Sequence, residues 1–231
     1  MGFLSLALII DNFGGIAGWS LWEVAFLFGM VETAFGFMDM VFSGFDPGYF
    51  GRQIRLGRFD QFLLRPENIT IQVLGSEFII RRLGRIFQGM IVFLLAISQL
   101  NIHWTVIKLV YLPIVFISLV CFFGGLFIIG STITFWTVES IEIINIFTYG
   151  GSEMMAYPMH IYPDAMIKFF TYIIPAIFLN FYPALYILDK TDPLGFSPIA
   201  YTLAPIVGVV TIVLSLFFWR VGILRYQSTG T

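Results

Sequence analysis

The sequence predicts an all-α integral membrane protein, and three observations support that prediction. Hydrophobic residues make up 58% of the 231 positions and charged residues only 11%, with a mean hydropathy of +0.91. Several apolar runs are long enough to cross the roughly 30 Å of bilayer hydrocarbon as helices of about 20 residues. All arginines lie either between positions 52 and 85 or at positions 220 and 225. We therefore expect a single polytopic transmembrane domain, residues 1–231.

The arginines also predict the orientation of the chain. Cytoplasmic loops of membrane proteins carry an excess of Lys and Arg, so the arginine-rich loop, residues 45–85, and the C-terminus are both expected to be cytoplasmic. An even number of crossings must then separate them. The arginines of this loop are Arg52, Arg55, Arg58, Arg65, Arg81, Arg82 and Arg85.

The first part of the chain predicts one incomplete span and one complete span. Residues 1–10 are apolar but too few to cross a bilayer, and they lack the positive charge of a signal peptide. We expect them to be the end of a first, apparently truncated helix, the alternative being a half-span supported by its neighbours. Residues 20–44 then descend from outside to the arginine-rich loop.

Four further crossings are expected after that loop. Residues 86–101 rise to an outer turn, residues 106–130 return, and residues 140–157 rise again. The last span, residues 199–219, descends to Arg220. This even number agrees with the arginine distribution and gives six helices in all, counting the incomplete first one.

Residues 158–198 do not fit a simple span. Pro175 and Pro183 interrupt the apolar part of this segment, because proline lacks an amide donor and clashes with the preceding helical turn. Broken helix at membrane depth has to pack against protein. We expect an extracytoplasmic, Pro-rich segment of short helices that are re-entrant or lie in the outer leaflet. Two additional spans would need a longer segment, and one kinked span would place the final arginines outside.

Two acidic residues fall inside the first complete span. Glu32 is in its middle, and Asp39 follows seven residues later on almost the same helical face. An isolated charge at the bilayer centre costs about 2.5 to 3.5 kcal/mol, so these residues need a reason to be there. One interpretation places both on a translocation pathway. The other has them protonated, or paired with groups on neighbouring helices.

Enzymatic interpretations find little support in the sequence. It contains no G-x-x-x-x-G-K-[ST] phosphate loop and no G-x-S-x-G nucleophile motif. The only histidines, His103 and His160, lack the spacing of metal ligands, so no metal site is expected. We expect a non-catalytic chain without a cofactor of its own and without a nucleic-acid partner.

The chain resembles the type 2 ABC transporter permeases in a set of strings whose order and spacing match. They are GRFDQFLLRP, FWTVES, YPMHIYP, IIPAIFLNFYPAL, DPLG and the terminal WRVGILRYQSTGT. Within these permeases the resemblance is to the ABC-2 family transporter proteins, the membrane-spanning subunits of bacterial ABC exporters. It covers the chain from about Gly18 onward. It departs at the N-terminus, where family members carry an interfacial helix and a complete first span.

The resemblance implies a six-helix half-transporter for export across the bacterial inner (cytoplasmic) membrane, with the C-terminus in the cytoplasm. Such a subunit forms the translocation pathway as a dimer with a second permease subunit, identical or related. A separate ABC ATPase subunit binds ATP and Mg and supplies the energy. A self-contained, ion-coupled secondary transporter that uses Glu32 and Asp39 is the alternative, although the sequence has no obvious inverted repeat.

The resemblance also implies particular site residues. Family members place a coupling helix, which docks on the ATPase, in the loop between the second and third spans, and here it maps to residues 58–66. Arg65 and Pro66 are expected to end that helix. The alternative is that the loop arginines only fix topology or bind anionic lipid, which we expect for Arg52 and Arg55. The residues assigned to ATPase coupling are Arg58, Phe59, Asp60, Gln61, Phe62, Leu63, Leu64, Arg65 and Pro66; those assigned to an outer gate are Glu153, Tyr157, Tyr162, Pro175 and Pro183.

Overall fold

The computed structural model describes residues 15–137 and 142–228, and helices account for nearly all regular structure in that part of the chain. Three helices are long and apolar enough to cross a membrane, and a bent helix pair makes a fourth candidate. The predicted all-α membrane class is confirmed. The predicted partial span over residues 1–10 lies outside the described residues.

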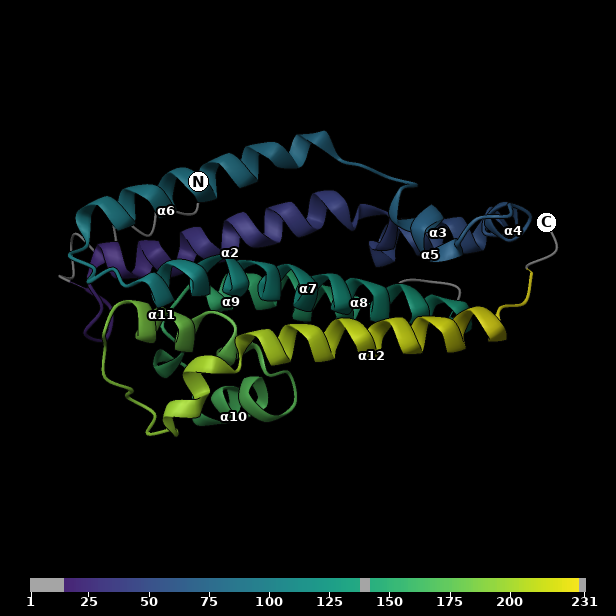
Figure 1. Ribbon diagram of the computed structural model, residues 1–231. Coiled ribbons are helices and arrows are strands. Elements are labelled where there is room, and N and C mark those ends of the chain that lie inside the picture. Colours follow the sequence, from purple (N-terminus) through teal and green to yellow (C-terminus); the bar gives the residue numbers. More distant parts are fainter. Residues whose placement is uncertain (1–14, 138–141, 229–231) are drawn as a thin grey trace.

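The first structural unit is an antiparallel hairpin of α2 (Leu21–Val41) and α6 (Leu83–Gln99). Ser20 and Glu23 form a capping box that starts α2. Glycines let the two backbones approach closely: a Cβ on Gly89 would lie 2.7 Å from Thr33 N. Helices are therefore present where the spans at residues 20–44 and 86–101 were expected, and they are direct neighbours (Figure 1), although only α2 is among the three long apolar helices.

The second unit is the pair α7 (Val106–Thr137) and α12 (Ala204–Arg225), which run in the same direction along each other. Gly208 abuts Ser118, and farther along Gly222 abuts Thr132. α7 continues seven residues beyond the expected end at Gly130. Gly130 does not end the helix. It lies inside α7, where the lack of a side chain allows close contact with Pro47 and Ile144.

The rise expected at residues 140–157 is described from residue 142 onward, and there it follows a broken path alongside α2. Tyr149 packs its ring 5.2 Å from that of Phe35, and His160 Nε2 lies 3.0 Å from the Ala17 carbonyl oxygen at the other end of the helix. The direction of this crossing is as predicted, but it is made of short pieces with a π-helical turn among them. The pieces are α8 (Glu142–Asn145), the π-helix (Ile146–Gly150), α9 (Gly151–Met155) and a 3-10 turn (Met159–Ile161).

The proline-rich segment forms a bent helical hairpin. Its helices are bent by 79° at the break that contains Pro175. His160, before the hairpin, contacts Ala17, and Lys190, after it, contacts Gly18, so both its ends lie at the same end of the molecule. Pro183 does not interrupt a helix, because it lies in the first turn of α11, where a backbone N–H would have no hydrogen-bond acceptor within the helix. The hairpin consists of α10 (Asp164–Tyr172), a 3-10 turn (Ala176–Phe178) and α11 (Phe181–Ile187).

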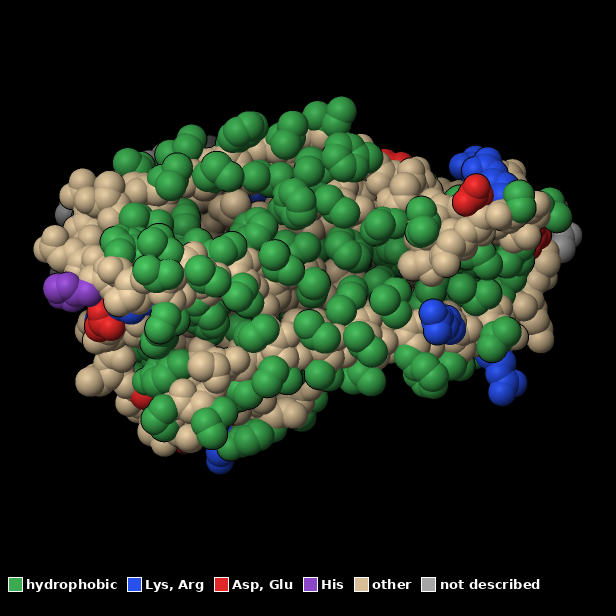
Figure 2. Space-filling view, viewed as in Figure 1, with side chains coloured by type: hydrophobic (Ala, Val, Ile, Leu, Met, Phe, Trp, Pro, Cys, Tyr) green, Lys and Arg blue, Asp and Glu red, His purple; other side chains and the backbone are tan. Residues whose placement is uncertain are grey.

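The opposite end of the molecule carries the arginine-rich loop and the described C-terminal residues (Figure 1). We call this the basic end, and the end with the hairpin termini the hairpin end. Figure 2 shows apolar side chains over the length of the long helices, with charged side chains mostly toward the two ends, as expected for a protein immersed in lipid. The helices of the basic end are α3 (Pro47–Arg55), α4 (Asp60–Leu63) and α5 (Ile69–Leu74), with 3-10 turns at Ser43–Phe45 and Ile80–Arg82.

Candidate functional site

The 58–66 segment forms the tip of the basic end around the single-turn helix α4. Leu64 is 85% exposed and Leu63 is 44% exposed, although both are apolar. Exposed charged and polar side chains surround these leucines, and the helix ends before Pro66 as the sequence predicted. An apolar centre with a polar rim is the composition of a protein docking surface. The exposed polar residues of the segment are Arg58, Gln61 and Arg65.

Phe59 was expected on this surface, and the structure corrects that expectation. Its side chain is completely buried in an aromatic cluster, with its ring 5.1 Å from that of Phe135 and 4.8 Å from that of Tyr226. Phe50 and Trp219 complete the cluster. Phe59 therefore anchors α4 to α3, α7 and α12. The reason is that a four-residue helix cannot be stable alone and needs tertiary packing.

Asp60 also acts within the molecule. Tyr226 Oη donates to its Oδ1 at 2.9 Å, and Ser228 Oγ donates to its Oδ2 at 2.7 Å. Burial, followed by the bond to the Asp60 carboxylate, raises the pKa of Tyr226 to about 12, so this hydroxyl stays protonated at neutral pH. The start of α4 and the residues just after α12 are thus joined directly.

We expect Tyr226→Phe to lower the free energy of unfolding by about 1 kcal/mol, because the ring packing remains while one hydrogen bond to a carboxylate is lost. Thermal unfolding of the purified protein in detergent would measure the change. Tyr172→Phe is the matched control, since Tyr172 is 73% exposed. Equal melting temperatures for the two variants would contradict the assigned role of the Tyr226 hydroxyl.

The acidic residues of α2 are held by arginines of the neighbouring hairpin partner. Arg85 binds Glu32 with both ends of its guanidinium group, Nε to Oε2 at 2.6 Å and Nη2 to Oε1 at 2.7 Å. The guanidinium carbon also lies 4.4 Å from the Phe35 ring centroid. Glu32 is 7% exposed, so this is a mostly buried, bidentate ion pair near the middle of α2.

A second ion pair lies one to two turns nearer the basic end. Arg82 Nε is 2.9 Å from Asp39 Oδ2, although the two atoms are not aligned as a hydrogen bond. Tyr149 in the π-helical turn bridges two carboxylates, with its hydroxyl 3.5 Å from Asp39 Oδ1 and 3.4 Å from Asp46 Oδ2. Single π-helical turns often occur at functional positions. This polar cluster connects α2, the rising segment and the start of α3.

Of the two sequence interpretations of Glu32 and Asp39, the structure supports pairing with a neighbouring helix. Arg82 and Arg85 were not expected as the partners, because their charge was already explained as a topology signal. The sequence did contain a signal for these two ion pairs. In an antiparallel hairpin, positions near 32 and 39 face positions near 85 and 82, so acids on one helix match arginines on the other.

Of the residues assigned to an outer gate, Glu153, Tyr157 and Tyr162 lie close enough to interact electrostatically, whereas Pro175 and Pro183 belong to the hairpin. Glu153 Oε1 lies 3.9 Å from Arg85 Nη2, and Ser152 Oγ lies 3.5 Å from the same nitrogen, so Glu153 is level with Glu32 and not at the outer end. The reason is that the rising segment reaches only the level of Leu27 at Met155. Tyr162 donates to Met154 O, and Tyr157 is half-buried. Pro175 lies at the hairpin break, and Pro183 lies in the first turn of α11.

Glu153 differs from the other acids at this level in its exposure. Its side chain is 68% exposed, whereas that of Glu32 is 9% exposed. A carboxylate facing lipid halfway along a span would cost several kcal/mol. The face that carries Glu153 and the 21% exposed side chain of Arg85 is therefore unsuited to lipid and suited to water or to another protein surface.

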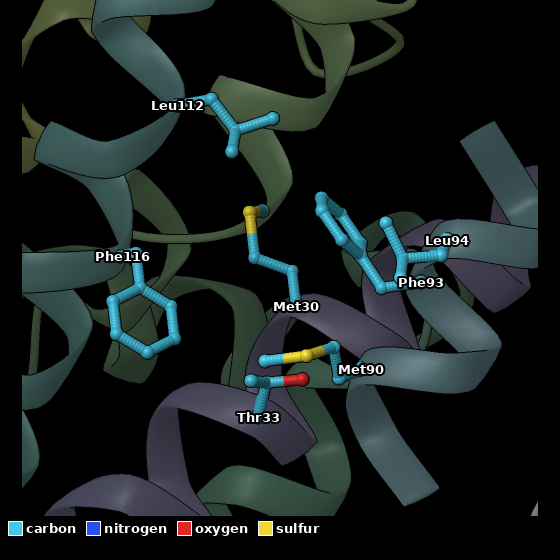
Figure 3. Close-up of a pocket in the computed structure, with 7 residues that line it drawn as sticks. All are labelled: Met30, Thr33, Met90, Phe93, Leu94, Leu112 and Phe116. Atoms are coloured by element: carbon cyan, nitrogen blue, oxygen red, sulfur yellow. The ribbon is translucent and has the colours of Figure 1, made fainter. Parts of the chain in front are cut away.

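An apolar cavity of about 260 Å³ lies on the other flank of α6, between α2, α6 and α7 (Figure 3). Its one hydroxyl, on Thr33, donates to Gly29 O at 2.6 Å and is therefore satisfied. The cavity offers no charged or nucleophilic group for chemistry. The residues that line it are Met30, Thr33, Met90, Phe93, Leu94, Leu112 and Phe116.

The comparisons with known proteins identify one family. A family model described as ABC-2 family transporter protein matches residues 1–230, which is nearly the whole chain. No curated protein and no solved structure matches. In the part of the chain that the structure describes, no group of three or more His, Cys, Asp or Glu side chains is placed to hold a metal ion.

Proposed function

The chain belongs to the ABC-2 family of transporter proteins, and we propose that it is the membrane subunit of an ATP-driven exporter. In this proposal it forms the translocation pathway with a second permease subunit, identical or related. ATP and Mg are bound by a separate ATPase chain, because this sequence contains no phosphate-binding loop. The membrane is the bacterial inner membrane, with the basic end and the C-terminus in the cytoplasm.

The observation that carries the proposal is the tip of the basic end. Leu63 and Leu64 are exposed on α4, at the tip of the basic end, where the protein core does not cover them (Figure 1). Behind them, Phe59 and Asp60 join the tip to α7 and α12 through the aromatic cluster and Tyr226. A force applied to the leucines by a docked ATPase would therefore reach two membrane helices directly.

The face around Glu153 is the proposed pathway side of the subunit. Its exposed carboxylate lies beside the Arg85–Glu32 pair at mid-membrane depth, where it needs water or a partner subunit. A pathway at a dimer interface supplies both. Glu32 and Asp39 support this face by pairing with Arg85 and Arg82, and they are not proposed to contact cargo themselves.

The alternative of an ion-coupled secondary transporter is less well supported. That mechanism needs a carboxylate free to bind and release an ion. Glu32 already receives two short bonds from one guanidinium, and Asp39 lies within ion-pair distance of another. We therefore propose ATP as the energy source.

Isolation of the tagged chain from its native membranes is expected to recover an ATPase. We expect Leu64→Asp to weaken this association at least about tenfold, because a buried leucine at an interface centre would become a buried charge. The measurement is the amount of ATPase recovered and the rate of ATP hydrolysis. Transport that proceeds on an ion gradient without nucleotide or ATPase would overturn the proposal.

Leu224→Asp is the matched control for the docking variant. Leu224 is 83% exposed at the end of α12, close to the 85% of Leu64, but it lies outside α4. We expect this control to retain the ATPase. Equal loss with both variants would show that α4 has no special part in docking.

A further inference from the structure

Two adjacent residues of opposite charge follow the bent helical hairpin and reach two different membrane helices. Asp189 pairs with Lys108 of α7, and Lys190 pairs with Glu23 of α2. We call these four residues the hairpin clamp. Because α2 and α7 are separate spans, the clamp holds their ends together at the hairpin end of the molecule.

The Lys108 half of the clamp is the more buried one. Lys108 Nζ donates to Asp189 Oδ2 at 2.7 Å and to Ile187 O at 3.0 Å, and its side chain is only 5% exposed. Asp189 has a φ of +53°, in the left-handed region that a non-glycine residue occupies at some cost. The bond to Lys108 helps to hold this conformation.

The Lys190 half ties the hairpin to the beginning of α2. Lys190 Nζ lies 2.8 Å from Glu23 Oε1 and 3.3 Å from Gly18 O, and 4.9 Å from the Trp19 ring centroid. Glu23 Oε2 at the same time accepts from Ser20 N in the capping box. One carboxylate therefore serves both the start of the helix and the attachment of the hairpin.

The clamped hairpin fills space between the long helices. Asn180 donates to Leu27 O of α2 at 3.2 Å and to Met155 O of α9 at 2.7 Å. Every residue from Ala176 to Leu185 is buried. Movement of the hairpin would therefore expose the interior between α2, α7 and α9.

The clamp and the mid-membrane pair differ in how readily they can open. Asp189 is 54% exposed, and the Lys190 and Glu23 side chains are 24% and 18% exposed, so water is close enough to hydrate the separated charges. The Arg85–Glu32 pair differs in that Glu32 is only 9% exposed and accepts two short bonds from one guanidinium, so its separation would be more costly. The clamp is thus the breakable connection, and the mid-membrane pair is the permanent one.

We propose that Lys108 and Glu23 are positioning residues that hold the hairpin closed in the nucleotide-free transporter, and that both ion pairs of the clamp open during export. This inference rests on the proposed ATP-driven function. It predicts that the interior behind the hairpin becomes accessible from water when the ATPase binds ATP, and when the clamp is removed by mutation.

The test uses a cysteine at Ala184, which is fully buried in α11, in a Cys121→Ala background. The permease and its ATPase, in lipid nanodiscs, are treated with a charged fluorescent maleimide, and the labelling rate is measured with and without ATP and Mg. We expect slow labelling without ATP and at least about fivefold faster labelling with it. Combined Lys108→Met and Glu23→Gln should label fast without ATP.

Two controls separate clamp opening from general loosening. In the first control the charges of one ion pair are exchanged, Glu23→Lys with Lys190→Glu, and Lys108 is left intact. This variant should label Ala184→Cys more slowly than the combined Lys108→Met and Glu23→Gln variant does. A reporter at Val73, which is fully buried in α5 at the opposite, basic end of the molecule, should stay slow in every variant. Faster labelling at Val73 in the clamp variant would mean loss of structure and would overturn the proposal.

The remaining outcomes distinguish the two proposals. One outcome is that ATP is hydrolysed while Ala184→Cys labels equally slowly with ATP and in the clamp variant. In that case the proposal that the clamp opens is wrong, and the ATP-driven function stands. If no ATPase associates with the wild-type chain, the proposed function fails first. Fast labelling of the clamp variant without any ATPase would still support closure by the clamp itself.

Discussion

Replacement of Arg85 by leucine is expected to lower the free energy of unfolding by about 3–5 kcal/mol, the largest effect of any single charge removal in this protein. The change leaves the Glu32 carboxylate mostly buried without the two bonds, at 2.6 and 2.7 Å, that now neutralise it. It also removes the contact of the guanidinium with the Phe35 ring and its 3.9 Å contact with the Glu153 carboxylate. Glu32 would have to take up a proton or draw in water.

Thermal unfolding in detergent would measure this effect, with Arg81→Leu as the matched control. Arg81 is exposed in the same arginine-rich loop, so its loss should change the melting temperature little. The double variant Glu32→Met with Arg85→Met should recover most of the stability, because it removes both charges and keeps similar volume. If the double variant were as unstable as Arg85→Leu, an unpaired carboxylate would not be the cause.

The sequence was sufficient for the main membrane architecture. The helices α2, α7 and α12 follow from apolar runs of spanning length, and the proline-rich segment between the rising segment and α12 is made of short, sharply bent helices. These predictions depend on hydrophobicity and on the backbone limits of proline, which act locally along the chain. The broken rise through α8 and α9 was harder, because a π-helical turn leaves no clear pattern in composition.

The candidate site was predicted less well, for a physical reason. Which arginine pairs with which acid depends on the register of α2 against α6, and that register is set by glycine contacts that composition does not reveal. The burial of Phe59 depends similarly on Trp219 and Tyr226, more than 150 positions away. A phenylalanine beside leucines and arginines has the same local sequence whether it faces a partner or the core.

The register also explains why the mid-membrane ion pair can form at all. A guanidinium reaches a carboxylate on the next helix with two bonds only where the helix axes are close and correctly aligned. Gly29 lies against the Phe93 backbone, and Gly36 lies against Ile86, on either side of the Arg85–Glu32 contact. The small residues therefore position the charges, and the charges in turn fix the alignment.

Gly89→Val is accordingly expected to be the second most damaging substitution, lowering the free energy of unfolding by at least about 1–3 kcal/mol. A Cβ at Gly89 would lie 2.7 Å from Thr33 N and 2.9 Å from Glu32 Cβ, and a backbone atom of α2 cannot rotate away. The helices would have to separate, which stretches the Arg85–Glu32 pair nearby. Gly84→Val is the matched control in the same helix, because a Cβ there meets nothing within 4 Å. Comparison of the two melting temperatures measures the cost of the close approach itself, and equal values would mean that α2 and α6 are not held together by the Gly89 contact.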